Sequence, residues 1–346
     1  MKKLLTLVLA IAMLGTLLVG CGEKTTPDQP KTPDDSTVTA EPMKLDIASI
    51  YTDGSCVDSA CIKLTQLLND SGLFEATYYN NGQLGAIGDS FESVLGGDKL
   101  ITIGGGSDWG DVVGVNNMGV IMTPFLYDEI GDVYGISESD LWKGMLSDAE
   151  SNGVKILNAP IVSGSRYFMT SKEVRTPADF AGMKVRTPTS SYYVNAMTAF
   201  GATPVAIPVG DLYTSLAQKM ADGCEFPYAD AYTRQLYEVL KYAASTPYVT
   251  TYDFFGISTE VWNAMSSEQQ AALESAAAEA STYSLDIFKD LEADGKQKLA
   301  DAGMEFIDID VDSFRACMDK FYELAGWTDD FKSAVTTAME TYRANK

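Results

Sequence analysis

A long run of helix-forming residues in the C-terminal third most constrains the fold. It begins at "MSSEQQAALE", where Ser266 and Gln269 have the spacing of a capping box, and it continues to Ala302. At a rise of 1.5 Å per residue such a helix reaches roughly 55 Å, more than the width of one small domain. We therefore expect it to brace two domains, and the alternative is two helices broken near Gly295.

The rest of the chain alternates between apolar strand patterns and helix patterns, which is typical of parallel α/β construction. With 346 residues, the chain is long enough for two hydrophobic cores. The predicted strands lie at 45–50, 74–79, 100–103, 154–157, 167–170, 183–186 and 224–226. The predicted helices lie at 58–69, 89–95, 137–152 (with Ser137 as the N-cap), 211–220 and 233–243.

The N-terminus has the pattern of an export signal. Two lysines precede an apolar run from Leu4 to Val19, which is shorter than the roughly 20 residues that span a bilayer. Residues 1–21 therefore read as a signal peptide, and Cys21 after "LVG" resembles the acylated cysteine of a bacterial lipobox. Residues 22–43 are rich in Thr, Pro and Asp and predict a disordered tether. We expect a folded body that starts near Lys44, outside the cytoplasm and anchored to the membrane by lipid.

The cysteine and histidine content limits the possible metal chemistry. The chain has no histidine, and its other four cysteines are scattered, so we expect no zinc site and no metal-ligating residues. Whether a metal ion bridges a bound ligand stays open. A disulfide between Cys56 and Cys61 and a pair of buried free thiols both remain open.

The charge of the chain restricts its partners. It has 25 basic and 48 acidic residues and a net charge of -23, which argues against a nucleic-acid partner. Long-range attraction would not help an anionic ligand, so specific buried cations would have to capture it.

Enzyme signatures are weak. The glycine-rich stretch "IGGGSDWGD" lacks the Lys and Ser/Thr of a P-loop and the spacing of a dinucleotide fingerprint. No G-x-S-x-G sequence occurs, and the lack of histidine removes the commonest general base. We expect a protein without catalytic residues or a cofactor.

Arg186 stands out because it closes a strand, "MKVR", directly before Thr187-Pro188. Ligands of α/β proteins bind beyond the carboxyl ends of the strands, and a guanidinium matches a carboxylate with two hydrogen bonds. The alternative is an arginine paired with a neighbouring acid. Arg166, expected just before the strand at 167–170, could clamp the same anion.

Several segments, in this order, resemble the extracytoplasmic solute receptors of tripartite ATP-independent periplasmic (TRAP) transporters, in the dicarboxylate-receptor branch. The likeness runs from Lys44 almost to the end of the chain and is strongest between Arg175 and Tyr242. The segments are "NNGQLG" (80–85), "TPFLYD" (123–128), "SRYFMTSKEVRTPADFAGMKVRTP" (165–188), "FGATPVAIPVGDLYTSLAQKMADGCEFPYADAY" (200–232) and "YEVLKY" (237–242).

The resemblance implies a two-lobed periplasmic-binding-protein-like fold of class II type, with a long helix that crosses both lobes. It divides the chain into lobe I (44–163 plus 252–291) and lobe II (164–251 plus 292–346). It also implies that the lobes close around an organic acid and deliver it to TRAP permease subunits. Arg186 then corresponds to the family's principal carboxylate-binding arginine, and Arg166 to a frequent second contact.

Departures from the family pattern concern the ligand. Phe226 replaces an amide that faces the ligand in the family, and a phenyl ring suits an apolar or aromatic group. Thr189 and Val209 align with other pocket positions. The glycines at 104–106, Gly105 among them, replace larger side chains and are expected to leave space beside Trp109. These features favour a bulky, less polar monocarboxylate over a C4 dicarboxylate, with Phe226 as part of the core as the alternative.

Two other functions stay open on the sequence alone. The same pocket would suit a two-lobed receptor that serves an ATP-driven importer or a sensor. A secreted enzyme that acts on carboxylates is the third possibility.

Overall fold

The computed structural model describes residues 41–346, which include the whole of the predicted folded body. The predicted signal peptide, the lipobox at Cys21 and the predicted tether up to residue 40 lie outside the described residues. The first strand begins at Met43. Among the residues from 41 onward, no helix is both long and apolar enough to cross a membrane.

The described chain forms a mixed sheet in the order β2-β1-β3-β10-β5-β8-β6-β7, with β4 paired to β10, and β9 paired to both β5 and β11. The strands are β1 (Met43–Ala48), β2 (Phe74–Tyr79), β3 (Leu100–Gly105), β4 (Val154–Ile156), β5 (Ile161–Thr170), β6 (Lys184–Thr187), β7 (Thr203–Ala206), β8 (Gly223–Phe226), β9 (Tyr242–Ala244), β10 (Val249–Ser258) and β11 (Glu305–Ile307).

Two parallel groups of strands make up the ends of this sheet. Strand β1 is parallel to β2 and β3, and β6 is parallel to β7 and β8. The ten-residue strands β5 and β10 are antiparallel to each other and link the two groups. Both strands cross the predicted boundary between the lobes, and their register shifts between Thr251 and Tyr252. These findings give the predicted two-lobed α/β fold, while the exact lobe limits stay a prediction.

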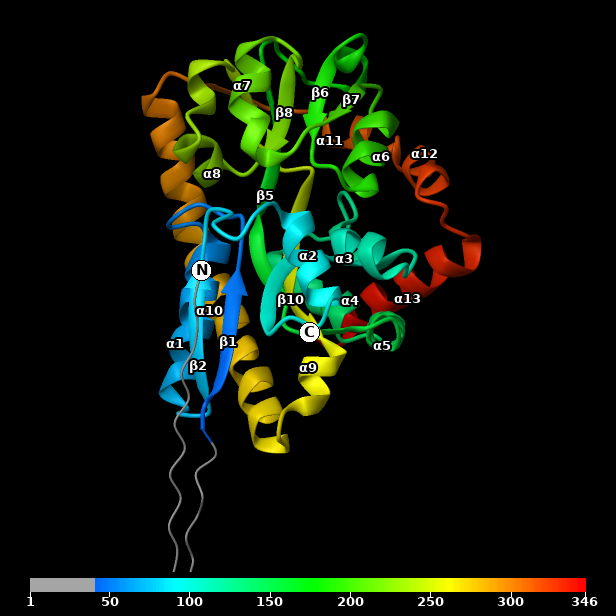
Figure 1. Cartoon of the computed structure of the whole chain (residues 1–346). Helices are drawn as coiled ribbons and strands as arrows, with labels where there is room; N and C mark the ends of the chain where they lie inside the picture. Colours follow the sequence, from blue (N-terminus) through cyan, green and yellow to red (C-terminus); the bar gives the residue numbers. More distant parts are fainter. Residues whose placement is uncertain (1–40) are drawn as a thin grey trace, which may run out of the picture. The chain divides into compact units, whose positions relative to one another are not determined.

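Helices cover both groups of strands (Figure 1). They are α1 (Cys56–Asp70), α2 (Ile87–Leu95), α3 (Gly106–Val113), α4 (Tyr134–Ser137), α5 (Asp140–Ser151), α6 (Ser191–Ala199), α7 (Leu212–Ala217), α8 (Tyr228–Thr233), α9 (Thr259–Ala264), α10 (Ser267–Asp301), α11 (Val311–Arg315), α12 (Met318–Leu324) and α13 (Asp329–Asn345). Short 3-10 helices are η1 (Met118–Met122), η2 (Ile130–Val133), η3 (Pro177–Phe180), η4 (Val209–Asp211) and η5 (Leu236–Glu238).

Helix α10 confirms the long helix predicted from the sequence. It has 35 residues, and Ser266 and Gln269 form the capping box. It is continuous through Gly295, so the alternative of two helices is wrong. One half packs on α1 and the other on α8, and Figure 1 shows it passing from the group around β1 to the group around β8.

The buried apolar residues form two hydrophobic clusters, and α10 contributes side chains to both. One contains Val57 and Leu64 of α1, Ile101 of β3 and Leu273 of α10, all fully buried. The larger cluster includes Phe168, Phe180 and Phe314, whose rings pack within about 6 Å of one another. The larger cluster also contains Trp109 and Trp142 of predicted lobe I, so the two clusters do not divide in the same way as the two predicted lobes.

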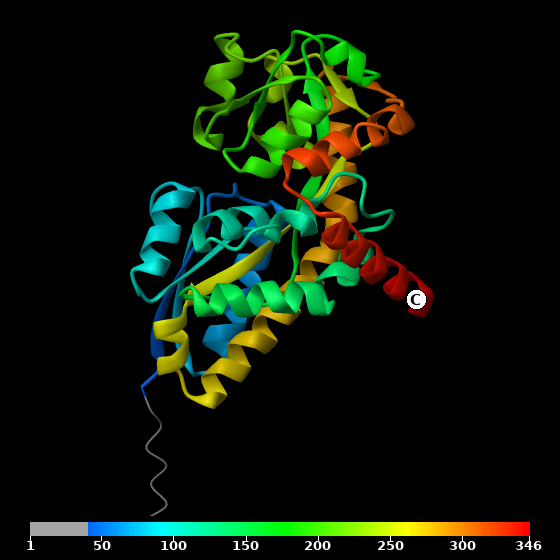
Figure 2. The same ribbon diagram turned by 90° about the vertical axis from the view of Figure 1, so that its right-hand side faces the viewer.

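The C-terminal helix returns to the first group of strands. Helix α12 packs on α6, whereas α13 packs on α4, α5 and η2 (Figure 2). The last helix of predicted lobe II therefore lies against elements of predicted lobe I. Arg343 of α13 reinforces this contact, because it donates to the carboxylate of Asp128 at 2.8 Å.

Two local predictions need correction. Ser139, not Ser137, caps α5, since its hydroxyl accepts from the amide of Trp142. The predicted helix at 233–243 is absent: α8 ends at Thr233, Gln235 adopts a left-handed conformation, and the chain continues into η5 and β9. Backbone pairing of β9 with β5 and β11 outweighs the helical propensity there.

The cysteine question is also resolved in favour of thiols. Cys56 and Cys61 are free and buried in α1, and Cys224 in β8 is likewise a buried free thiol. Burial raises the pKa of Cys56 to about 12, so this side chain stays protonated.

Candidate ligand-binding site

Arg186 lies in β6, one residue before the strand ends, with only 1% of its surface exposed. Its Nε donates to the carbonyl of Ile207 at 2.8 Å, which fixes the guanidinium beyond the end of the neighbouring strand β7. Its buried Nη1 has no hydrogen-bond partner within residues 41–346, and no carboxylate there forms a salt bridge with it. The alternative of an arginine paired with a neighbouring acid is therefore not what the structure shows.

This environment is costly for a cation. The pKa of Arg186 is lowered to about 10, mainly because the side chain is buried. The negative charge of Glu225 raises this pKa in part, and the positive charge of Arg166 lowers it. The side chain remains protonated at neutral pH because even this value lies well above 7. A buried cation with a free N–H group suits an anion, since a hydrogen-bonded counter-charge would offset the cost of desolvation.

Arg166 lies inside β5, whereas the sequence placed it just before that strand. Its Nε contacts one oxygen of the Glu225 carboxylate, while Nη2 donates to the other at 3.1 Å and to the Glu225 carbonyl at 2.9 Å. Burial alone would lower the pKa of Arg166, but the charge of Glu225 raises it well above its usual value. Arg166 is thus neutralised internally, unlike Arg186.

Phe226 lies at the centre of a cluster of three guanidinium groups. The central carbons of these groups lie 5.3 Å (Arg166), 6.0 Å (Arg186) and 6.0 Å (Arg234) from the ring centroid. The side chain is 5% exposed. Such distances are those of cation–π contacts, so the ring stabilises the arginines as well as filling space.

The glycines at 104–106 do not leave the expected space beside Trp109. A Cβ at Gly104 would lie 2.6 Å from the ring of Phe91, and one at Gly106 would lie 2.5 Å from the carbonyl of Met118. Trp109 itself is fully buried, and its indole N–H donates to the carbonyl of Phe254 at 2.9 Å. The glycines permit close packing here, which removes one of the two reasons to expect a bulky monocarboxylate.

Gly105 closes β3 and pairs in register with Asp253 of β10. A Cβ on Gly105 would lie 3.0 Å from the carboxylate of Asp108, which accepts from the Gly105 amide at 3.1 Å. The absence of a side chain at position 105 therefore lets the end of β3 approach the Asp108 carboxylate closely.

Thr189 and Val209 follow the carboxyl ends of the neighbouring parallel strands β6 and β7. Thr189 is exposed and Val209 is half-buried. Both thus lie at the same edge of the sheet as Arg186, as their predicted roles require.

The sequence reasoning missed several buried acids around this cluster. Glu225 is fully buried and also accepts from the hydroxyl of Tyr248 at 3.0 Å. Asp253 accepts from the hydroxyl of Tyr51 at 2.5 Å, and Asp230 accepts from Thr52 at 3.2 Å. The sequence did contain a pattern that could have indicated Glu225. It is the single acid in the otherwise uncharged strand β8, and a buried acid requires an internal partner.

Burial changes the ionisation of two of the acids near Arg166. It raises the pKa of Asp108 to about 7, with Asp253 adding to the effect. Burial also raises the pKa of Asp253 to about 6, although the hydrogen bond from Tyr51 acts to lower it. Positive charge is therefore less fully compensated in this region when these acids hold a proton.

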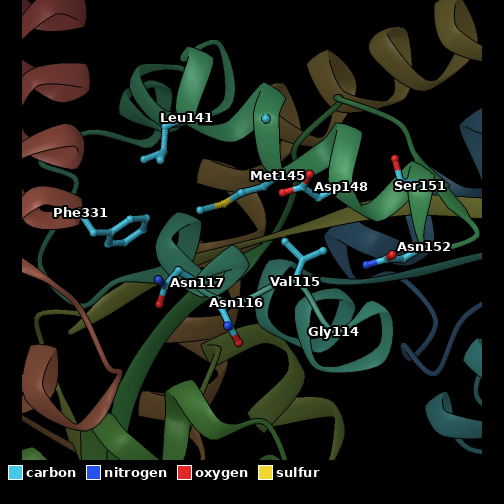
Figure 3. A pocket seen from close by; sticks show the side chains of 11 residues that line it. Gly114, Val115, Asn116, Asn117, Leu141, Met145, Asp148, Ser151, Asn152 and Phe331 are labelled. Atoms are coloured by element: carbon cyan, nitrogen blue, oxygen red, sulfur yellow. The ribbon is translucent and has the colours of Figure 1, made fainter.

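A hollow of about 580 Å³ lies elsewhere, beside the loop at residues 114–117. Figure 3 shows its lining, in which Met145 and Leu141 of α5 lie near Phe331 of α13. None of the three arginines lines this hollow. Asp148 is the only charged residue that lines this hollow, and its negative charge would repel an organic acid.

The two-lobed α/β fold, the long helix and the cationic group at a strand end define the class of extracytoplasmic solute-binding proteins. Residues 47–326 match the family described as bacterial extracellular solute-binding protein, family 7, named DctP. The match covers most of the chain, and the protein belongs to this family. The predicted resemblance to TRAP receptors is thereby confirmed.

Individual relatives agree with this assignment. The chain is 27% identical, over 81% of its length and 85% of the relative's, to the 2,3-diketo-L-gulonate-binding periplasmic protein YiaO of Escherichia coli. A TRAP periplasmic solute-binding protein from Desulfovibrio salexigens, in complex with diglycerolphosphate, is 26% identical with a TM-score of 0.80, covering 88% of this chain and 98% of the other. The corresponding protein of Actinobacillus succinogenes, with bound L-galactonate, has a TM-score of 0.80 at 24% identity, covering 86% and 100%.

Proposed function

We propose that this protein is a TRAP receptor that captures an organic acid anion by its carboxylate and delivers it to the membrane permease. One observation carries the proposal: Arg186 is a buried cation whose Nη1 has no partner among residues 41–346. A carboxylate at this N–H group would form a charge-assisted hydrogen bond, which contributes on the order of 1.5–3 kcal/mol net. The similar protein of Actinobacillus succinogenes has bound L-galactonate, and YiaO is named for binding 2,3-diketo-L-gulonate; both ligands carry a carboxylate.

The supporting residues have different roles in this proposal. Arg166 is paired with Glu225, so in this proposal it positions the Phe226 ring beside Arg186 and does not bind the ligand carboxylate itself. Phe226 fixes the guanidinium groups, and Thr189 and Val209 border the ligand at the ends of β6 and β7. Gly105 and Trp109 shape the backbone on the β3 side and need not touch the ligand.

Contacts between the two lobes support a closing motion as the working step. The hydroxyl of Ser190, which follows β6, donates to the hydroxyl of Ser107 in α3 at 2.6 Å. Thr52 donates to Asp230 of α8 at 3.2 Å. Both hydrogen bonds join predicted lobe I to predicted lobe II. A ligand that contacts both lobes would favour the closed arrangement by its differential affinity for that state.

The lipid anchor is the part of the proposal that concerns the N-terminus. The sequence pattern up to Cys21 supports export and acylation of this cysteine, and the following residues would tether the receptor near its permease. Globomycin sensitivity of processing, and mass spectrometry of the mature N-terminus, test this part. A mature protein that lacks diacylglycerol on Cys21 would contradict it.

Identification of the ligand tests the receptor function itself. The protein should be purified under native conditions, and any small molecule it releases should be identified by mass spectrometry. A thermal-shift screen of hydroxy, keto, sugar and aromatic acids should give stabilisation of about 2.7 kcal/mol for a ligand at 100 times its dissociation constant. The proposal fails if neutral sugars or amines stabilise the protein and none of the acids does.

A further inference from the structure

Asp108 and Asp253 are two acids of predicted lobe I to which the receptor function described above gives no role. Asp253 of β10 is 3% exposed, and Asp108 is half-buried in the first turn of α3. Gly105, the last residue of β3, pairs in register with Asp253 and donates its N–H to Oδ2 of Asp108. Both acids therefore lie at the carboxyl end of β3, at the edge of the sheet where α/β proteins bind ligands.

The start of α3 faces the end of the strand that contains Arg186. Ser107, which precedes Asp108, accepts a hydrogen bond at 2.6 Å from Ser190, which follows the end of β6. Both serines are buried. The elements that hold Asp108 and Arg186 thus meet across the boundary between the predicted lobes.

The two acids also lie within reach of the charges around Phe226. The positive charge of Arg166 acts to lower the pKa of Asp108 and of Asp253. The guanidinium carbon of Arg166 lies 4.7 Å from the ring centroid of Tyr193, and the charges of both acids act on the hydroxyl of that tyrosine. The acids of predicted lobe I and the arginines of predicted lobe II therefore belong to one cluster of interacting charges.

Neither acid has a cation of its own within residues 41–346. No lysine or arginine there forms a salt bridge with Asp108 or Asp253, and Arg166 is occupied by both oxygens of Glu225. Asp253 accepts from the hydroxyl of Tyr51, but Oδ1 of Asp108 accepts no hydrogen bond from this part of the chain. Burial, and then the charge of Asp253, raises the pKa of Asp108 to about 7, which reflects the cost of two adjacent carboxylates.

The two sides of the cluster lack opposite charges. Arg186 in predicted lobe II is a buried cation whose Nη1 has no partner among residues 41–346, whereas the acids of predicted lobe I lack a cation. A ligand with a carboxylate alone would satisfy Arg186 but would bring a further negative charge near two acids. An ammonium group on the same ligand would offset those acids as well.

We propose that the ligand is an amino acid, whose carboxylate binds Arg186 and whose ammonium group binds Asp108, with Asp253 adding negative potential beside it. This inference rests on the proposed function, because it takes Arg186 as the carboxylate contact. The ligand keeps the single carboxylate that the sequence led us to expect. Its two charged groups would hold the two predicted lobes together, since each lobe provides one of the opposite charges.

Matched ligands measure the contribution of the ammonium group. The probes are glycine, alanine, phenylalanine, β-alanine, 4-aminobutyrate and 5-aminopentanoate, each beside the acid that has a hydroxyl in place of the amine. The different spacings between amine and carboxylate cover a range of distances between Asp108 and Arg186. Calorimetry should show at least one amino acid binding about tenfold or more tightly than its hydroxy acid, because a hydrogen bond between opposite charges is stronger than one from a hydroxyl.

Variants of Asp108 test its role in this preference. Asp108→Asn keeps the size and the acceptor for the Gly105 N–H, and it should lose the preference for the amino acid while it retains the affinity for the hydroxy acid. Asp108→Glu restores the charge and should recover part of the preference. Asp290→Asn, at an exposed position of α10, should behave as the wild type. Circular dichroism melting verifies that each variant folds.

Proton exchange on binding gives a readout that a purely structural role of Asp108 would not change. The charged groups around Asp108 are Asp253 and Asp111, which raise its pKa, and Arg166, which lowers it. An added ammonium group favours the ionised carboxylate, so at pH 6.5 the amino acid should release more protons on binding than its hydroxy acid. Calorimetry in buffers of different ionisation enthalpy measures this difference, which should disappear in Asp108→Asn.

Three results would each overturn the inference. The wild type could bind every hydroxy acid at least as tightly as its amino acid, it could bind none of the amino acids, or Asp108→Asn could leave the preference for the amino acid unchanged. Arg186→Gln tests the proposed function separately, since it should weaken both members of each pair. Unchanged affinities in Arg186→Gln would contradict the carboxylate contact, whereas the comparison within each pair is made in the wild type.

Discussion

Gly295 of α10 lies directly against Ala229 of α8, and a Cβ at position 295 would come within 2.5 Å of the Ala229 backbone nitrogen. This contact holds the long helix close to the helix that leads to Arg234. Because backbone atoms cannot move aside as a flexible side chain can, we expect Gly295→Ala to destabilise the protein by roughly 1–3 kcal/mol. Denaturant unfolding followed by circular dichroism measures this change.

Gly144 of α5 is the matched control for this substitution. A Cβ there would meet no heavy atom within 4 Å, so Gly144→Ala should stabilise the protein by up to about 1 kcal/mol through helix propensity. If both substitutions stabilise the protein equally, the close packing of α10 on α8 is wrong.

The second prediction concerns the buried pair of Arg166 and Glu225. Arg166→Met leaves the Glu225 carboxylate, which is 0% exposed, without its counter-charge. Removing one partner of a buried ion pair typically costs about 3–5 kcal/mol, and we expect a loss of this size in chemical denaturation. The double variant Arg166→Met/Glu225→Leu should recover much of the loss, because no uncompensated charge remains.

An exposed pair gives the comparison. Lys298→Met removes the i,i+4 contact with Asp294 on the solvent face of α10, and it should leave the midpoint of unfolding nearly unchanged. A double variant no more stable than Arg166→Met would contradict the pairing of Arg166 with Glu225.

The third prediction is a pH dependence that originates at Asp108. Burial raises its pKa from 3.8 to about 7, so the folded state binds this proton more tightly than the unfolded state. The corresponding contribution to stability is present below pH 3.8 and is lost as the pH rises through about 7. Unfolding of the ligand-free protein should therefore become easier over this range, by up to about 1.4 kcal/mol per pH unit for this group.

Asp108→Asn should make that dependence shallower, while the contribution of Asp253, whose pKa burial raises to about 6, remains. The amide oxygen can still accept from the Gly105 N–H group, which now meets the carboxylate at 3.1 Å, while the titrating charge is gone. Asp290→Asn, at an exposed position of α10, should leave the profile as in the wild type. Parallel profiles for the wild type and Asp108→Asn would show that Asp108 is already ionised throughout.

The sequence was sufficient to predict features that local rules determine. The capping box at Ser266 and the absence of helix breakers specify α10, and the pattern before Pro188 specifies β6 with Arg186 near its end. Residue alternation placed β2 correctly from Phe74 to Tyr79.

Features that depend on contacts between distant residues were missed. Strand β10 was not predicted because it is buried on both faces, and its pairing with β3 and β5 defines it rather than an alternating pattern. The partners of the buried acids at 225, 230 and 253 lie far away in the chain, which hides them from any local pattern. Arg166 lies near Phe226 because β5 pairs with β8, and Arg234 lies near it because α8 directly follows β8.

The most direct test of the account is calorimetric titration of the cognate acid into the wild type, Arg186→Gln and the exposed control Arg175→Gln. If Arg186 binds the ligand carboxylate, Arg186→Gln should weaken binding at least about tenfold with the fold intact, and Arg175→Gln should bind as the wild type does. An affinity of Arg186→Gln equal to that of the wild type would contradict the central claim.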